Sequence, residues 1–300
     1  MSIGNIGLVL LSCLFHSYWN VLTQTSGNSQ YFSALKGMWI LALAVTFQGL
    51  FDFHFFHPVI LFWGVVSGIL HGLYIYCLSR AYHTQDISYV YPIARSAPVF
   101  VPALAFVLLG ERLTLSTLAA IFLIVLAIYI LHFEGHLVQG FRNLFDAVIH
   151  KDLRWAFLTL GMVVCYSLVD KRGMDAFLQL YPDRFFANGI IFFFLESLVG
   201  FTFYNIYLWM VSPHREILQL WRAEWGRGFL AGAATLGSYG TICIVLQFEP
   251  VSAVVSLRQV SVLMVVYWGC WKLGEPFGQQ RLWAGALTVA GVGMMALNPL

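Results

Sequence analysis

Two arginines lie in apolar stretches of the chain, where an ionisable side chain is costly. Arg95 lies in a hydrophobic run over 88–109 and Arg258 in another over 251–271, each seven residues after the start of its run. In a helix, that spacing corresponds to a depth of roughly 10 Å. A guanidinium group binds a carboxylate through two parallel hydrogen bonds. The two arginines therefore predict binding of an anionic molecule, with a structural ion pair or snorkelling as the alternative.

Glu196 is an acid inside an otherwise apolar stretch over 190–203. Such a carboxyl group either pairs with Arg95 or Arg258 or binds a proton that couples transport. If Glu196 neutralises one arginine, the case for an anionic substrate weakens.

Further polar and aromatic residues lie in runs that would face a central cavity. Together with the two arginines, we expect the following side chains to contact a substrate: Trp19, His71, Tyr74, Tyr91, Tyr239 and Gln259. Aromatic faces also bind cations, and packing or interfacial anchoring is the alternative role for each ring.

Three prolines, Pro92, Pro98 and Pro102, fall in the run that holds Arg95. Proline removes a backbone donor and bends a helix, so freed carbonyl groups could line a cavity. The run around Arg258 contains no proline, so the sequence predicts a broken helix in the first half of the chain only.

The elements that carry these residues are transmembrane helices. Of 300 residues, 60% are hydrophobic and only 10% are charged, and the mean hydropathy is +0.78. A bilayer core needs about 20 apolar residues per helix, and the runs do not alternate as barrel strands would. We predict an all-α integral membrane protein with ten transmembrane helices at 4–22, 31–51, 58–79, 88–109, 115–133, 154–171, 187–211, 228–247, 251–271 and 280–297.

Two further segments show apolar residues at helical spacing between charged ones. The segments 134–153 and 213–227 are therefore expected to be helices in the membrane interface. The segment 172–186 shows no clear pattern. The net charge of +2 excludes a basic surface for nucleic acid, and the five cysteines lie in separate runs without metal-binding spacing, so no metal is expected.

An internal repeat relates the two halves of the chain. When 88–127 is aligned with 252–291 at an offset of 164, ten of forty positions are identical, including Leu-Gly-Glu at 109–111 and 273–275. Glu111 and Glu275 would begin the last helix of each half and cap its amides. Five spans per half make the repeats inverted, which is typical of secondary transporters. The predicted units are 4–133, a linker at 134–153, and 154–297.

These repeats resemble the EamA domain of the drug/metabolite transporter superfamily. The resemblance rests on five spans ending in Gly-Glu and a last helix, and on His16–Asn20 and Tyr166–Lys171 at the two repeat openings. It implies a ten-helix carrier with a central cavity formed by its third, fourth, eighth and ninth spans. It does not identify the substrate.

We therefore expect a secondary transporter that exports a small polar metabolite, an amino acid or another carboxylate, by alternating access. The alternatives are a carrier of a cationic, quaternary-ammonium or lipid-linked substrate, and a polytopic membrane enzyme. Because catalytic and nucleotide-binding motifs are missing from the sequence, we expect no catalytic residues and no cofactor. The expected partners are a small-molecule substrate, a coupling proton and the lipid of a bacterial inner (plasma) membrane, with the chain a monomer or homodimer. Basic residues favour termini outside the cell, whereas relatives are often described with cytoplasmic termini.

Overall fold

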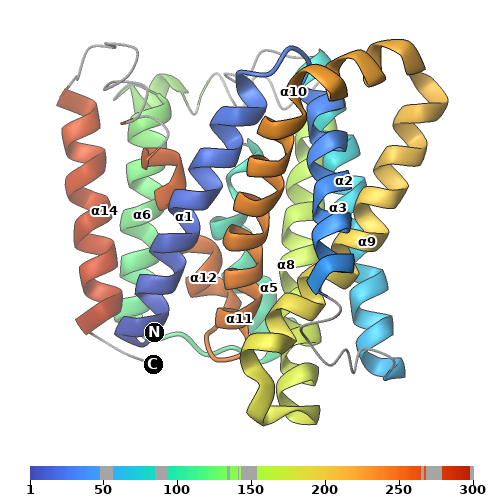
Figure 1. The fold of residues 1–300 in the computed structure, drawn as a ribbon. Coiled ribbons are helices and arrows are strands. Elements are labelled where there is room, and N and C mark those ends of the chain that lie inside the picture. Colours follow the sequence, from blue (N-terminus) through green and yellow to red (C-terminus); the bar gives the residue numbers. More distant parts are fainter. Residues whose placement is uncertain are drawn as a thin grey trace. The chain divides into compact units, whose positions relative to one another are not determined.

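The structure is a computed structural model that describes residues 1–47, 57–84, 93–133, 136–140, 142, 154–264, 267 and 279–297. Within these residues every regular element is helical (Figure 1). The elements are α1 Ile3–Gln24, α2 Ser29–Phe47, α3 Pro58–Thr84, α5 Ala97–Leu109, α6 Leu115–His132, α8 Arg154–Leu180, η2 Pro182–Arg184, α9 Phe185–Val211, α10 His214–Thr235, the π-helix η3 Leu236–Gly240, α11 Thr241–Leu246, α12 Val251–Leu257 and α14 Gln279–Leu297.

The chain forms two compact units. Unit 1 comprises Met1–Cys13, Cys77–Leu168 and Glu249–Leu300, and unit 2 comprises Leu14–Tyr76 and Val169–Phe248. The boundary between them falls within α1, α3 and α8.

Unit 1 is built around the pairing of α6 with α14, and α12 packs on α5 and α6. Its buried core includes Ala127, Val262 and Ala284. In unit 2, α2 packs on α9 and α10, and α11 packs on α9. The core between α2, α9 and α10 includes Tyr31 and Tyr204.

Within the described part of the chain, four helical stretches are long and apolar enough to cross a membrane: Ile3–Gln24, Pro58–Leu78, Pro182–Val211 and His214–Leu246. Shorter apolar helices are found at Ala97–Leu109, Leu115–Ile130 and Val251–Met264. Large apolar side chains such as Leu14, Phe106 and Val289 are exposed on their helices. In a membrane, such faces contact lipid.

Each of the ten predicted spans contains a helix of the described chain, and the largest differences from the predicted bounds are found in the sixth and eighth spans. The sixth span, predicted to end at 171, continues as α8 to Leu180 and includes most of the segment that showed no pattern. The segment 213–227 is helical, and it continues through α10 into the eighth span with a kink at Glu224 (Figure 1). Of the predicted linker 134–153, the structure describes 136–140 and 142.

The fourth predicted span is interrupted at Arg95 and Ser96, because α5 begins only at Ala97. Pro98 in the first turn lacks an N–H group and disfavours helical geometry in the residue before it. Pro102 lies inside α5, whereas Pro92 lies outside the described residues. The span is therefore interrupted before Pro98, whereas α5 continues through Pro102.

The ninth predicted span is also interrupted, so the prediction that only the first half contains a broken helix is wrong. α12 ends at Leu257, and a turn at Arg258 and Gln259 precedes a further helical stretch. The Arg258 carbonyl accepts hydrogen bonds from Ser261 Oγ at 2.7 Å and Cys13 Sγ at 3.5 Å. Because hydroxyl and thiol groups satisfy this carbonyl, the turn needs no proline.

Candidate functional site

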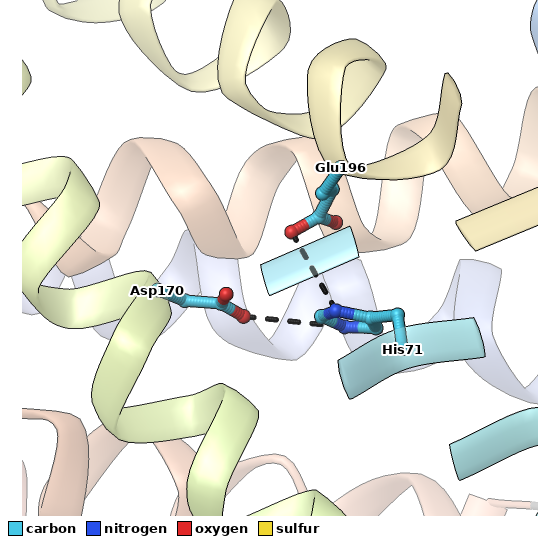
Figure 2. A group of neighbouring side chains, drawn as sticks. All are labelled: His71, Asp170 and Glu196. Atoms are coloured by element: carbon cyan, nitrogen blue, oxygen red, sulfur yellow. Dashed lines mark ion pairs between the residues drawn. The ribbon is translucent and has the colours of Figure 1, made fainter. Parts of the chain in front are cut away.

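Three ionisable side chains meet inside unit 2. His71 of α3, Asp170 of α8 and Glu196 of α9 point toward one another (Figure 2). His71 Nδ1 lies 3.8 Å from Glu196 Oε2, and His71 Nε2 lies 4.0 Å from Asp170 Oδ2. The two acid side chains are 0% and 3% exposed, and the imidazole is 18% exposed. Such buried charges in a membrane helix are costly, and they usually serve a function.

The Ser67 hydroxyl joins the two acids. Its Oγ contacts Asp170 Oδ1, lies 3.0 Å from Glu196 Oε2 and lies 3.2 Å from His71 Nδ1. A hydroxyl carries one proton, so it can donate to one carboxylate at a time. A hydrogen bond between Ser67 and the second carboxyl group then needs a proton on that carboxyl. The arrangement suits the binding of one proton between two acids.

The orientation of His71 follows from a backbone contact. Its Nδ1 lies 3.0 Å from the carbonyl oxygen of Ser67, and a carbonyl can only accept a hydrogen bond. Nδ1 therefore carries a proton, and Nε2 is the ring nitrogen that faces Asp170.

Tyr239 completes the cluster from the π-helix η3. Its hydroxyl donates a hydrogen bond to Asp170 Oδ2, and its ring lies edge-on to the imidazole of His71 with centroids 5.2 Å apart. A π-helical turn inside a longer helix rotates the side chains that follow and is frequent at functional sites. Here the turn places a phenol against a buried carboxyl group.

Glycines bring α3 and α9 close enough for this cluster to form. Gly64, Gly68 and Gly72 repeat every four residues on one face of α3. A Cβ at Gly68 would lie 2.5 Å from the Val199 Cβ and 2.6 Å from the Glu196 carbonyl oxygen. Small residues at this spacing let two membrane helices approach closely. Ser67 and His71 flank this contact and therefore reach Glu196.

The donor atoms of His71, Asp170 and Glu196 all lie within 4.8 Å of one another. One cation at their centre could contact an imidazole nitrogen and two carboxylate oxygens, which suits a divalent metal ion as well as a protonated amine. Tyr239 and Ser67 add two hydroxyl oxygens next to Asp170. The chemistry that the cluster offers is binding of a positive charge.

The predicted substrate contacts are divided between the units. In unit 2, His71, Tyr239 and Glu196 lie together, Tyr74 follows His71 on α3, and Trp19 of α1 contacts Lys36. The predicted pairing of Glu196 with Arg95 or Arg258 stays a prediction. Glu196 belongs to unit 2, whereas both arginines belong to unit 1.

In unit 1, Arg95 and Gln259 line the same small cavity, next to Ser96 and Tyr129. Gln259 is 6% exposed, and among the residues that the structure describes its Oε1 has no hydrogen-bond partner. Arg258 adjoins Gln259 at the interruption of the ninth span. Tyr91 and Glu275 lie outside the described residues.

The role of Asp170 in the cluster was not anticipated from the sequence, nor was that of Ser67. The sequence placed Asp170 at the end of a span, but α8 continues to Leu180, so this acid lies within the helix. Because Asp170 ends an apolar run and is followed by Lys171 and Arg172, its sequence position is a weaker signal than that of Glu196. Ser67 gives no such signal, because serines are common in membrane helices.

Glu111 caps a helix other than the expected one. α6 begins at Leu115 with Thr114 as its N-cap. The carboxylate of Glu111 instead accepts hydrogen bonds from the amides of Val251 and Ser252, at 2.6 and 3.3 Å, and from Ser252 Oγ at 2.7 Å. These hydrogen bonds lie at the start of α12, and not at the start of the last helix of the first half, where the carboxylate was expected.

Comparisons with known proteins agree with this architecture. A crystal structure of a protein shares the fold, with a TM-score of 0.75 over 99% of this chain and 98% of the other at 14% sequence identity. A comparison with curated proteins gives no match. The apolar helices and the family match below indicate an integral, multi-pass membrane protein. Residues 3–133 match the EamA-like transporter family, part of the drug/metabolite transporter superfamily, and this confirms the predicted resemblance over that part of the chain.

Proposed function

We propose that the chain is a proton-coupled secondary transporter that exports a small polar metabolite by alternating access. The observation that carries the proposal is the buried cluster of His71, Asp170 and Glu196, with a single serine hydroxyl between its two acids. A proton that binds there neutralises charge inside the membrane, and its release restores that charge. Such a change can favour one of two conformations of a carrier.

The proposal includes ten spans in two inverted five-helix repeats, a first repeat at 4–133 and a second at 154–297. The positions of the helix interruptions support it. At the repeat offset of 164, Arg95 corresponds to Gln259, and both residues lie where a span is interrupted. Broken helices at corresponding positions of two repeats are frequent at transporter binding sites.

For the substrate, we propose an amino acid or another carboxylate-bearing metabolite. Arg95 and Gln259 line one cavity, and a guanidinium beside an amide can bind a carboxylate through several hydrogen bonds. We propose that Arg258, next to Gln259, contributes a further contact, and Tyr74, Tyr91 and Trp19 stay predicted substrate contacts. A membrane enzyme is disfavoured because the matched family is one of transporters.

A cationic substrate is the second candidate. Two buried carboxyl groups and the ring of Tyr239 surround the same point, and these groups bind an ammonium ion as well as a proton. In this case the cluster would be the substrate site itself.

The titratable groups around the cluster come from every helix that forms it: His71 of α3, Asp170 of α8, Glu196 of α9 and Tyr239 of η3. Lys171, next to Asp170, forms an ion pair with Asp175 Oδ1 at 2.7 Å and donates to the Leu246 carbonyl at 2.8 Å. Lys36 of α2 lies near Phe201 of α9. Variants of the cluster residues would therefore show which of these groups causes a pH dependence of transport.

The test begins with a thermal-shift screen of the purified protein against anionic, zwitterionic and cationic metabolites, because a ligand of the folded state raises its stability. Confirmed ligands are then loaded into proteoliposomes that contain a pH-sensitive dye. We expect substrate-driven proton movement that disappears in Glu196→Gln and Asp170→Asn. Asp175→Asn, which changes an acid on the same helix outside the cluster, should behave as the wild type.

Three results would redirect the proposal. Wild-type proton movement in both cluster variants would show that protons bind elsewhere. Loss of amine binding in the same variants, with no proton movement in the wild type, would favour the cationic substrate. A shift of unfolding temperature by Zn²⁺ or Mn²⁺ that EDTA reverses, without proton movement, would assign the cluster to a metal.

A further inference from the structure

Besides the acid cluster, unit 2 contains a buried lysine, Lys36. Lys36 lies on α2 and is 6% exposed. The helix is held close to its neighbours at this level, because Gly37 packs on the ring of Phe201 in α9, and a Cβ on Gly232 in α10 would lie 3.3 Å from the Lys36 carbonyl oxygen. The side chain is therefore enclosed by helices.

The contacts of Lys36 are aromatic. Its Nζ lies 3.8 Å from the centroid of the Trp19 ring and 5.9 Å from that of Phe201. Among the residues that the structure describes, no ion pair or hydrogen bond is formed by this ammonium group. An ammonium group has three donors and no acceptor. The face of one indole ring offsets only part of the cost of removing such a charge from water.

Trp19 adds another donor to the same place. Its Nε1 is buried and has no hydrogen-bond partner in the described part of the chain. The indole N–H is a donor only. Lys36 and Trp19 together therefore present N–H donors without an acceptor. The acid cluster presents acceptor oxygens, whereas this pair of donors is complementary to an oxyanion.

We propose that Lys36, supported by Trp19 Nε1–H, binds the negatively charged group of the transported substrate. The inference rests on the proposed function in taking the ligand to be the substrate. A carboxylate oxygen next to Nζ would accept the unused hydrogen bonds and neutralise the buried charge. Glu196 and Phe201 are five residues apart on α9, so the anion site and the acid cluster lie roughly 7.5 Å apart along this helix.

The position in unit 2 distinguishes this site from the one predicted at Arg95 and Arg258, which belong to unit 1. It also explains why a lysine is present inside a span that otherwise contains no charged residue within Ser29–Phe47. A lysine kept only for packing would be replaced by methionine without loss of ligand binding.

The test measures binding of sodium benzoate to the purified full chain by isothermal titration calorimetry, with benzamide as the neutral analogue and inorganic phosphate as a second anion. We expect benzoate to bind, benzamide not to bind, and Lys36→Met to reduce benzoate affinity at least tenfold. Lys36→Arg should retain binding because it keeps the positive charge. Binding of phosphate as well would widen the ligand class from carboxylates to oxyanions.

Controls separate this site from the other two. Glu196→Gln should lose proton movement but keep benzoate binding. The proposal of an anion site is therefore tested independently of proton coupling. Arg95→Ala tests the cavity of unit 1 separately. Unchanged benzoate binding in Lys36→Met would overturn the proposal, as would a wild-type chain that binds neither benzoate nor phosphate. The thermal stability of unliganded Lys36→Met should equal or exceed that of the wild type, because a buried charge is removed.

Discussion

At Ser67, one hydroxyl group lies between two buried carboxyl groups and an imidazole. Each neighbour can exchange a proton or a hydrogen bond with it, so the protonation of the cluster is coupled through this atom. The backbone carbonyl of the same residue accepts a hydrogen bond from His71 Nδ1. Ser67 therefore positions the histidine and links the acids, although it is not itself ionised.

Replacement of Ser67 tests this link. Ser67→Ala should lower the free energy of unfolding by about 1–3 kcal/mol, because buried carboxyl groups lose a partner. It should also shift the pH profile of transport, which a purely structural residue would not do. Ser67→Thr keeps the hydroxyl and should restore the profile. Equal profiles for the wild type and Ser67→Ala would show that the hydroxyl does not link the acids.

Glu111 provides a second prediction for a single residue. Its carboxylate accepts two amide hydrogen bonds at the start of α12. Glu111→Ala should destabilise the protein by about 0.5–2 kcal/mol, the usual value of a lost N-terminal cap. Thermal unfolding in detergent measures the difference. Asp183→Ala, which removes an exposed acid of η2, is the control, and an equal effect of both changes would contradict a capping role.

At the scale of elements, the approach of α3 to α9 decides whether the cluster can form. The glycine face of α3 leaves no room for side chains, since a Cβ on Gly72 would lie 2.9 Å from Phe203 Cδ1 and 3.3 Å from the Gly200 carbonyl oxygen. Two helices that pack through such faces are fixed in both distance and register. The positions of Ser67 and His71 relative to Glu196 follow from this register.

A larger residue at Gly68 should therefore separate α3 from α9 and displace the cluster side chains, although Gly68 is not one of them. We expect Gly68→Val to cost about 1–3 kcal/mol by overpacking and to abolish proton coupling even though no cluster side chain is changed. Unfolding temperature and dye-based proton movement measure the two effects. Gly161→Val in α8, where nothing lies within 4 Å of an added Cβ, is the matched control. Normal coupling in Gly68→Val would show that the close approach is not required.

At the scale of the whole molecule, an odd number of spans per repeat makes a prediction about topology. If each repeat has five spans, both termini lie on one side of the membrane and the linker 134–153 lies on the other. The proposal of inverted repeats depends on this arrangement.

Single cysteines in a cysteine-free background test the topology. Ser2→Cys and Leu297→Cys should react with a membrane-impermeant maleimide from the same side, and Gln139→Cys from the opposite side. Gln139 and Leu297 are exposed, so their labelling is not limited by burial. Labelling of all three positions from one side would require an even number of spans in the first repeat.

The sequence by itself determined the class of the protein and the location of its helices. Long apolar runs with few charges require helices in lipid, because every backbone polar group must be satisfied inside the segment. This requirement is local, so α1, α6 and α14 were placed within a few residues. The Leu-Gly-Glu repeats also indicated the EamA-like family, because a motif is read directly from neighbouring residues.

Only the tertiary structure decided which residues form the site. Ser67 and Asp170 are 103 residues apart, and Glu111 and Val251 are 140 apart, so no local pattern connects them. The role of Asp170 depends on the continuation of α8, and the turn at Arg258 depends on contacts with Cys13 and Ser261. Hydrophobicity reports where a helix is buried in lipid, whereas the partner of each polar side chain is set by how the helices pack against one another.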